Sequence, residues 1–282
     1  MSKIAFVTDS TAYIPQNLCE KYNITMLPQI LIWGEETFRD GVDIQPDAFY
    51  QRLATAKVMP SSSQVSLANF QETFQRLLDE GYEVLTVLIS QKLSGTVASA
   101  TQARANFPDT APIEIVDSHS TAMAMGFQIL HTARAVQEKG LSLSEARLVV
   151  ENSRQRTGII FTPETLEFLH RGGRIGGATR FLGTALNIKP ILDLQDGYIE
   201  PLERVRTRKR AKKRLVDIIT ERTAGKPAHI AVLHANAANE ARELMEMTQS
   251  AVQVVESIIS DVSPVIGTHV GPGTLAIAYM TD

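Results

Sequence analysis

The sequence contains a single cysteine, Cys19, and no CxxC pair. One thiol cannot form an internal disulfide, and no histidines stand at metal-ligand spacing, so we expect no metal site. No apolar run approaches the ~20 residues that a membrane-spanning helix needs. The segment before Asp9 also contains too few apolar residues for a secretion signal. We therefore expect a cytoplasmic protein without stable membrane insertion.

An excess of positive charge is also missing. The formal net charge is -3, whereas general nucleic-acid binders carry a basic excess, so we expect no nucleic-acid partner. Residues 204–214 are a local exception, and they could form a solvated helix face or a patch for an acidic protein, a phosphate-bearing ligand or an anionic membrane. The cations of this segment are Arg204, Arg206, Arg208, Lys209, Arg210, Lys212, Lys213 and Arg214.

The common enzyme motifs are absent. Ser94 stands in Ser-Gly-Thr and not in GxSxG, and the chain has no P-loop, no HExxH and no GxGxxG after its first apolar run. The glycine-rich residues 172–177 could in principle bind phosphate. They follow a predicted helix, however, so they are only weak evidence for a phosphate site. A stand-alone hydrolase or phosphotransferase that uses Asp9, Asp117 or His269 stays open as the alternative to a binding protein.

What is present is a pattern of short apolar runs and helices. In the first half, runs such as residues 83–89 and 113–116 alternate with helical segments, which is typical of βαβ units around a parallel sheet. We predict strands at 4–7, 25–33, 83–89, 113–116, 157–161, 188–194, 198–205, 228–234, 252–259 and 274–279. We predict helices at 17–22, 45–56, 66–80, 97–106, 122–139, 163–169 and 209–222.

The pattern changes near residue 155. Asp196-Gly197 lies between two apolar runs and indicates a hairpin. We therefore predict an α/β fold with two domains. Residues 1–155 would form a Rossmann-like parallel sheet with helices on both faces, and residues 156–282 an α+β domain.

Polar loops in the first half could build a site. Residues 60–64, 94–96 and 117–119 follow strands or precede helices, and loops at the carboxyl ends of parallel strands share one edge. Ser94 stands where a helix should begin, a point that attracts anions. Each residue also has an ordinary interpretation: Ser94 as an N-cap, and Asp9 or Asp117 as a turn stabiliser. His269 precedes Gly271-Pro272-Gly273, which indicates a tight bend.

These motifs together resemble the DegV family, in the family's order and over nearly the whole chain. Where the family has Thr-Ser-Gln-Pro-Ser, this sequence has Ser62 for the threonine and Val65 for the proline, so a hydroxyl is kept at the first position. The matching motifs are Asp9-Ser10-Thr11-Ala12, Ser62-Ser63-Gln64-Val65-Ser66, Ser94-Gly95-Thr96, Asp117-Ser118, Gly172-Gly173-Arg174-Ile175, Ile188-Lys189-Pro190, Arg206-Thr207 and Gly271-Pro272-Gly273.

The resemblance implies a non-catalytic protein that buries a long-chain fatty acid and needs no cofactor. It places the carboxylate at Ser62, Ser94 and His269. It also implies a separate ATP-dependent fatty acid kinase subunit that phosphorylates the carboxylate for phospholipid synthesis, with Arg206 and Arg174 at the encounter. Ser63, Gly95, Thr96, Asp9 and Ser118 are supporting candidates.

Elementary energetics agree with such a ligand. Burying one methylene contributes roughly 0.8 kcal/mol, so about 16 carbons give on the order of 10 kcal/mol before entropy costs. A buried carboxylate must be paired or hydrogen-bonded. Hydroxyl donors, amides at a helix start and a protonated His269 are the groups that we expect to meet it.

Overall fold

A computed structural model of the chain describes residues 3–183 and 188–281. The first half is built on a parallel sheet in the order β2-β1-β6-β7. Its strands are β1 (Lys3–Asp9), β2 (Ile24–Leu27), β6 (Tyr82–Leu88) and β7 (Ile113–Asp117). β1 and β6 are almost entirely buried, as their continuous apolar runs require of a parallel sheet covered on both faces.

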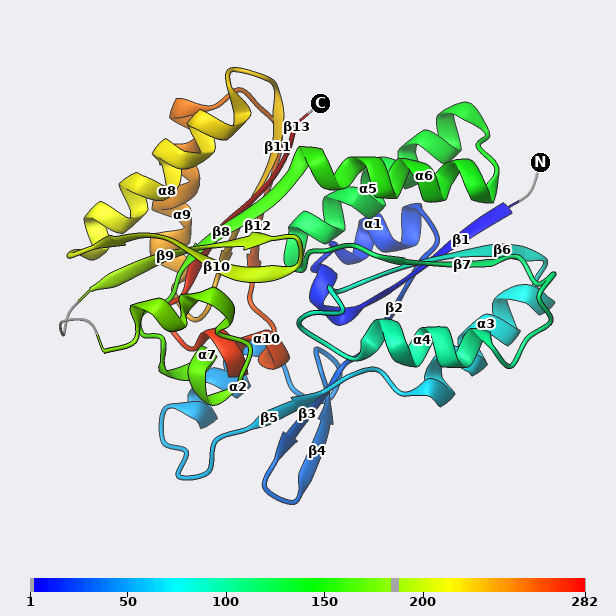
Figure 1. Ribbon diagram of the computed structural model, residues 1–282, viewed down its shortest axis with the longest axis horizontal. Coiled ribbons are helices and arrows are strands. Elements are labelled where there is room, and N and C mark those ends of the chain that lie inside the picture. Colours follow the sequence, from blue (N-terminus) through cyan, green and yellow to red (C-terminus); the bar gives the residue numbers. More distant parts are fainter. Residues whose placement is uncertain (1–2, 184–187, 282) are drawn as a thin grey trace.

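Helices cover both faces of this sheet, so the predicted fold class is confirmed (Figure 1). α3 (Leu67–Asp79) and α4 (Thr96–Arg104) pack on one face, and α5 (Ala122–Lys139) and α6 (Leu143–Ser153) on the other. α1 (Gln16–Lys21) lies beside β2. The sequence analysis missed α6, although Ser142 and Glu145 form a capping box that marks its start.

A small antiparallel sheet projects from the first half and corrects two predictions. The predicted strand at 25–33 is two strands of different sheets, β2 and β3 (Ile30–Trp33), because Pro28 between them has no N–H for a ladder. The predicted loop at 60–64 contains β5 (Ser61–Ser63), which pairs with β3. β4 (Glu36–Arg39) completes the sheet, and α2 (Pro46–Leu53) follows it.

The second half contains a mixed sheet in the order β10-β9-β8-β13-β11-β12. Asp196 and Gly197 have φ of 48° and 84° and join β9 to β10, which confirms the predicted hairpin. The strands are β8 (Thr157–Thr162), β9 (Lys189–Gln195), β10 (Tyr198–Val205), β11 (Ala228–His234), β12 (Val254–Asp261) and β13 (Leu275–Thr281).

Helices α8 (Arg208–Thr223) and α9 (Ala238–Ala251) pack against the mixed sheet. The sequence analysis did not predict α9 or α10 (Pro264–Val270). α7 (Glu167–Arg171) begins later than the helix predicted at 163–169. Short 3-10 turns lie at Ser10–Ala12, Arg154–Arg156 and Gly176–Phe181, the last within the glycine-rich segment.

Helix α5 joins the two halves. It packs against β1 and β6 of the parallel sheet and also against β8, β11 and β13 of the mixed sheet. Its first nine residues are all buried, as expected of a helix that is apolar on all sides. The predicted boundary at 155/156 stays a prediction, because one continuous apolar core includes side chains of both halves.

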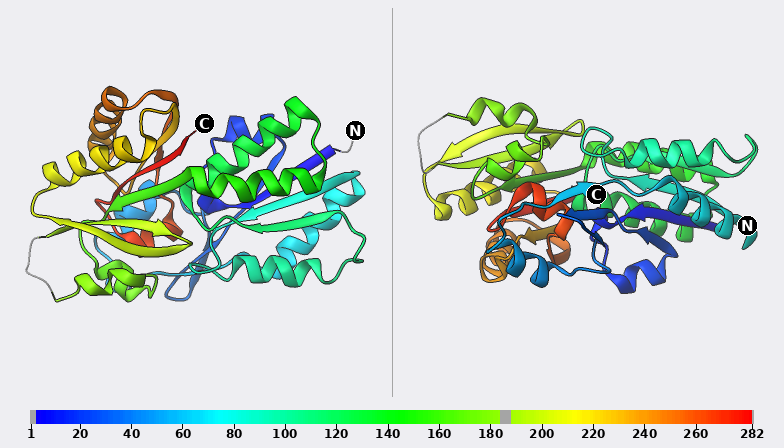
Figure 2. Two further views of the ribbon diagram at one scale, coloured as in Figure 1. Left: turned by 45° about the horizontal axis from the view of Figure 1, so that its top comes forward. Right: turned by 90° about the horizontal axis from the view of Figure 1, so that it is seen from below.

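Helix α10 is the second connection between the halves. It lies beside α2, β3 and β5, which precede it by some two hundred residues in the chain (Figures 1 and 2). Asp40, at the end of β4, accepts a hydrogen bond from Val265 N in the first turn of α10 at 3.0 Å. This contact brings His269, in the last turn of that helix, over the strand that carries Ser62.

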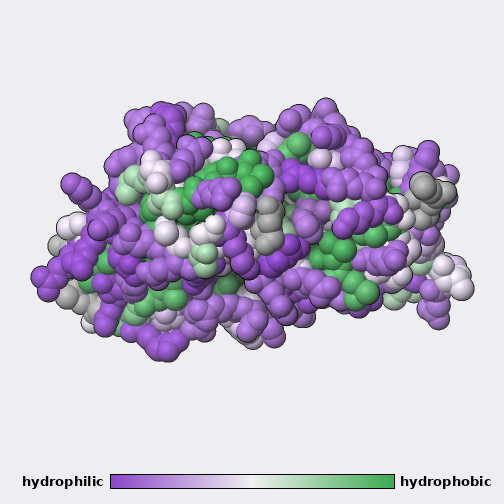
Figure 3. Space-filling model, turned by 90° about the horizontal axis from the view of Figure 1, so that it is seen from above, coloured by the Kyte–Doolittle hydropathy of each residue, from purple (hydrophilic) through white to green (hydrophobic). Residues whose placement is uncertain are grey.

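The described residues include no helix that is both long and apolar enough to cross a membrane. Polar side chains cover most of the face shown in Figure 3, and apolar residues reach it in separate places.

Candidate functional site

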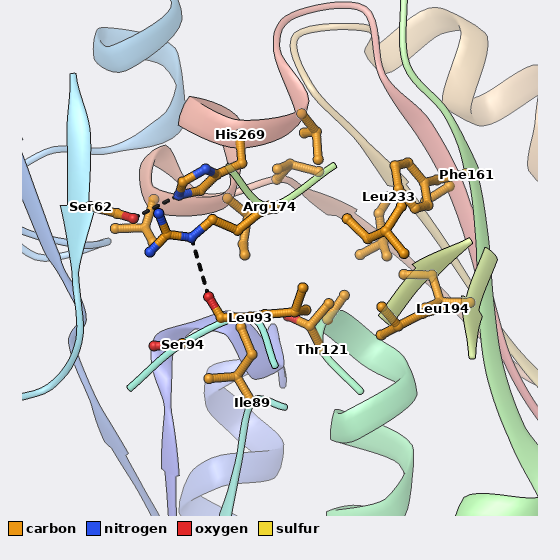
Figure 4. Close-up of a pocket in the computed structure, with 18 of the residues that line it drawn as sticks. Ser62, Ile89, Leu93, Ser94, Thr121, Phe161, Arg174, Leu194, Leu233 and His269 are labelled. Carbon is orange, nitrogen blue, oxygen red and sulfur yellow. Dashed lines mark hydrogen bonds between the residues drawn. The ribbon is translucent and has the colours of Figure 1, made fainter. Parts of the chain in front are cut away.

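A cavity lies where the two halves meet. The empty space within it, counted together with space open to solvent, is about 890 Å³. One end is polar and the rest is apolar, with side chains of Phe161, Leu194 and Leu233 at the far end (Figure 4). Phe161 and Leu233 are buried. The three predicted carboxylate-binding residues, Ser62, Ser94 and His269, all line this cavity.

Ser62 and His269 are in direct contact at the polar end. The hydroxyl Oγ of Ser62 lies 2.7 Å from Nε2 of His269, although 207 residues separate the two in the chain. The bond joins β5 to α10, which explains why the sequence could not show it. Both residues come to the cavity from elements that the sequence analysis described as loops.

The structure corrects the expectation of a protonated His269. The side chain is buried, and burial together with the positive charge of Arg174 lowers the pKa of His269 to about 4. The imidazole is therefore neutral near pH 7. Its Nδ1 has no hydrogen-bond partner among the described residues. Gly172 lies so close that a Cβ there would be 2.2 Å from Nδ1.

Ser94 stands just before α4, but it is not the N-cap that the sequence suggested. The N-cap is Gly95. Ser94 Oγ lies 2.8 Å from Thr96 Oγ1 and accepts a hydrogen bond from Thr96 N at 3.3 Å. The hydroxyl still stands at the start of a helix and lines the cavity, where the helix dipole favours negative charge.

Arg174 also lines the cavity, on the same side as Ser62 and His269 (Figure 4). Its Nε donates to the carbonyl of Leu93 at 3.3 Å, and Nη1 donates to the carbonyl of Gly172 at 2.8 Å. Both acceptors are neutral, and the salt bridges found among the described residues do not include Arg174. The polar end therefore has a net positive character.

The supporting candidates divide into two groups. Ser63 lines the cavity beside Ser62. Four others do not line it; the hydroxyl of buried Ser118, for example, donates to the carbonyl of Ser120 at 3.1 Å. These four are Gly95, Thr96, Asp9 and Ser118.

Asp9 is a structural carboxylate behind the cavity. It is fully buried and accepts hydrogen bonds from Thr11 N, Thr11 Oγ1, Gln29 Nε2 and Ile89 N. Burial raises the pKa of Asp9 in spite of these donors. The Asp9 carboxylate thus ties the end of β1 to its neighbours, as the turn-stabilising interpretation expects.

The residues of the enzyme alternative do not converge. His269 lines the cavity, whereas Asp9 and Asp117 do not. Asp117 instead accepts from the backbone N–H of His119 at 2.9 Å and of Gln91 at 3.3 Å. Among the described residues, no group of three or more His, Cys, Asp or Glu side chains could hold a metal ion.

Three of the eight cations in the basic segment 204–214 form ion pairs with acidic side chains. Arg208 pairs with Glu240 at 3.1 Å, and Lys212 pairs with Glu243 at 2.5 Å. Arg214 pairs with Glu203. Arg206 is exposed and lies outside the cavity wall. The ion pairs therefore neutralise only part of the segment, and Arg204, Arg206, Lys209 and Arg210 are exposed.

The sequence analysis missed most of the cavity wall. Tyr13, Gln29 and Thr121 line it, and the sequence offered only a helix start near residue 122 as a signal for the last. The wall residues come from both halves, so their grouping follows from how α5 and α10 hold the halves together.

The family model described as an uncharacterised protein, DegV family, matches residues 3–282. A DegV domain-containing protein of Clostridium perfringens is 36% identical over 284 residues, which cover 99% of both chains.

Solved structures agree with this match. A DegV family protein from Thermus thermophilus, described by its fatty acid binding, has a TM-score of 0.93 at 32% identity, covering 99% of this chain and 100% of the other. DegV of Bacillus subtilis, described as a fatty acid binding protein, has a TM-score of 0.90 at 32% identity and covers 100% of both chains.

Proposed function

Since this chain belongs to the DegV family, we propose that it binds a long-chain fatty acid in the cavity between its halves. The carboxylate lies at Ser62, Ser94 and His269, and the acyl chain follows the apolar wall. The observation that carries the proposal is the Ser62–His269 contact of 2.7 Å at the polar end of an otherwise apolar cavity. The fatty acid binding described for the Thermus and Bacillus relatives supports it.

The apolar wall supplies the affinity. Burial of about 16 carbons contributes on the order of 10 kcal/mol before the entropy of binding is subtracted. Ile159, Phe161 and Leu233 are each less than 10% exposed, so the tail end of the ligand would be out of water.

The polar end of the cavity offsets the desolvation cost of burying the carboxylate. A neutral His269 with its proton on Nε2 donates a hydrogen bond to Ser62 Oγ, and the Ser62 hydroxyl then donates a hydrogen bond to the carboxylate. Ser94 adds a second hydroxyl, and Arg174 adds positive charge nearby. Hydrogen bonds to a charged group contribute about 1.5–3 kcal/mol each, so these donors offset much of the desolvation of the anion.

We further propose that a separate kinase subunit phosphorylates the bound carboxylate with ATP. Ser62, Ser63 and Ser94 are half-buried and Gln64 is exposed, whereas the apolar end is buried. A partner can therefore reach the head group while the tail stays in the protein. Arg206, exposed and outside the cavity, is the residue that we assign to the encounter.

Native mass spectrometry of the purified protein, followed by denaturation and lipid identification, tests the binding proposal. We expect one fatty acid per chain, lost in the double variant Ser62→Ala, Ser94→Ala. Ser61→Ala is the matched control, because Ser61 is on the same strand, exposed and outside the cavity. An empty protein that takes up neither palmitate nor oleate would contradict the proposal.

The kinase step has its own test. With the kinase subunit of the same organism, ATP and bound palmitate, Arg206→Ala should slow acyl-phosphate formation while palmitate affinity stays the same. Arg210→Ala, at another exposed position of the basic segment, is the control. Equal rates for both variants and the wild type would remove Arg206 from the encounter.

A further inference from the structure

Gln29 contributes a firmly held amide group to the cavity wall. The residue directly precedes β3, is only 3% exposed and lines the cavity. Its backbone N donates to Ser10 Oγ at 3.1 Å, and its backbone carbonyl accepts from Asp40 N at 2.9 Å. The side-chain Nε2 donates to Asp9 Oδ1 at 3.2 Å. The main chain and the amide nitrogen are therefore both fixed, and only the amide oxygen Oε1 remains without a role.

This amide oxygen faces the cavity. Oε1 has no hydrogen-bond partner among the described residues, but it keeps accessible surface, unlike the unpaired polar atoms that the protein encloses. Because Gln29 is otherwise buried, the space that Oε1 reaches is that of the cavity. Asp9 also accepts from Thr11 and from Ile89 N, so a turned amide would place its oxygen against a carboxylate oxygen. The side chain thus presents an acceptor, and no donor, to a ligand.

The acceptor lies on the head-group side of the cavity. The bond from Asp40 N to the carbonyl of Gln29 continues the β3–β4 ladder by one residue, so the alternation of side chains along β3 includes Gln29. Leu31, two residues further on, pairs with Ser62 across the small sheet. Gln29 and Ser62 are therefore on the same face of that sheet, and both line the cavity.

We propose that Gln29 Oε1 accepts a hydrogen bond from a hydroxyl group close to the carboxylate of the ligand, so that the preferred ligands are long-chain fatty acids hydroxylated on the α- or β-carbon. This inference rests on the proposed fatty-acid binding and narrows its ligand class. An ionised carboxylate has no proton to donate, so the head group itself cannot pair with Oε1. A buried acceptor without a partner is costly, and a hydroxyl on one of the first carbons supplies the missing donor.

The preference should depend on this one amide oxygen. A neutral hydrogen bond corresponds to about fivefold in affinity, so the better-placed hydroxypalmitate should bind about fivefold more tightly than palmitate. Gln29→Met nearly keeps the length of the side chain and removes the oxygen, so it should abolish the preference. This variant should bind palmitate at least as tightly as the wild type, because it leaves no acceptor unpaired in the cavity.

The experiment is a titration of delipidated wild type, Gln29→Met and Gln75→Met with palmitate and with α-, β- and ω-hydroxypalmitate. Gln75→Met is the matched control, because Gln75 Nε2 also donates to an aspartate, Asp79, at 2.8 Å, but the residue is exposed and outside the cavity wall. The ω-isomer is the ligand control: its hydroxyl would lie at the apolar end and should weaken binding. Circular dichroism melting checks that the variants are folded.

A preference for α- or β-hydroxypalmitate that Gln29→Met abolishes and Gln75→Met retains supports the inference. If palmitate binds to the wild type and neither derivative binds more tightly, the inference is wrong while fatty-acid binding stands, whether or not Gln29→Met folds. A preference that survives in Gln29→Met also overturns it. If none of these ligands binds, both the inference and the proposed function are wrong.

Discussion

Gly172→Ala should disable the polar end of the cavity although it changes no polar group. Gly172 has φ −76° and ψ −9°, which alanine adopts without strain. The new Cβ, however, would lie 2.2 Å from His269 Nδ1 and 3.0 Å from Cε1. The imidazole must move away, and the 2.7 Å contact between Nε2 and Ser62 Oγ must lengthen or break.

The size of the effect follows from two terms. Overpacking of a buried site costs roughly 1–3 kcal/mol of folding stability. Loss of one hydrogen bond costs about 1 kcal/mol, which is about a factor of five in the dissociation constant for a fatty acid held through that bond. We therefore expect Gly172→Ala to lower both stability and affinity.

The assay combines palmitate titration, denaturant unfolding and NMR of the His269 ring. Gly173→Ala is the control: that glycine has φ +69° and open space around it, so alanine there should lower stability through backbone strain but leave affinity and ring resonances unchanged. In a His269→Ala background, Gly172→Ala should have little effect on stability. Unchanged affinity and unmoved ring resonances in Gly172→Ala would refute the reasoning.

Two further predictions concern the same site, and a third concerns the β9–β10 hairpin. Ser94→Ala should weaken palmitate binding about tenfold or more, since hydrogen bonds to a charged group contribute roughly 1.5–3 kcal/mol, and a titration with unchanged affinity would remove Ser94 from the site. The pKa of His269 is about 4 in the folded protein, against an ordinary value of 6.5. As pH falls, the unfolded chain therefore binds the proton before the folded protein does. The free energy of unfolding should keep its full value above pH 6.5 and fall by about 3 kcal/mol toward pH 4 because of this residue. Urea unfolding at several pH values should show a shallower loss of stability in His269→Gln, and parallel curves would count against a buried neutral imidazole. Gly197→Ala should raise the unfolding rate and loosen the hairpin, because Gly197 has φ +84° and an added Cβ would lie 2.2 Å from Ser90 Oγ. An unchanged melting temperature would show that the Ser90 side chain moves away at no cost in stability.

The sequence alone determined the parts of the protein that depend on local pattern. Apolar runs and helical periodicity identified β1, β6, β7 and α5, since burial on both faces requires a continuous apolar strand. Asp196-Gly197 identified the hairpin, because positive φ at both positions favours those residues. The ordered set of motifs identified the family and named Ser62, Ser94 and His269 together.

Only the tertiary structure decided how these residues meet and in what chemical state. The Ser62–His269 bond spans 207 residues and depends on the packing of α10 against β5, a contact between distant segments that no local pattern records. The charge of His269 was predicted wrongly for the same reason: burial and the approach of Arg174 lower its pKa, and both are properties of the assembled fold.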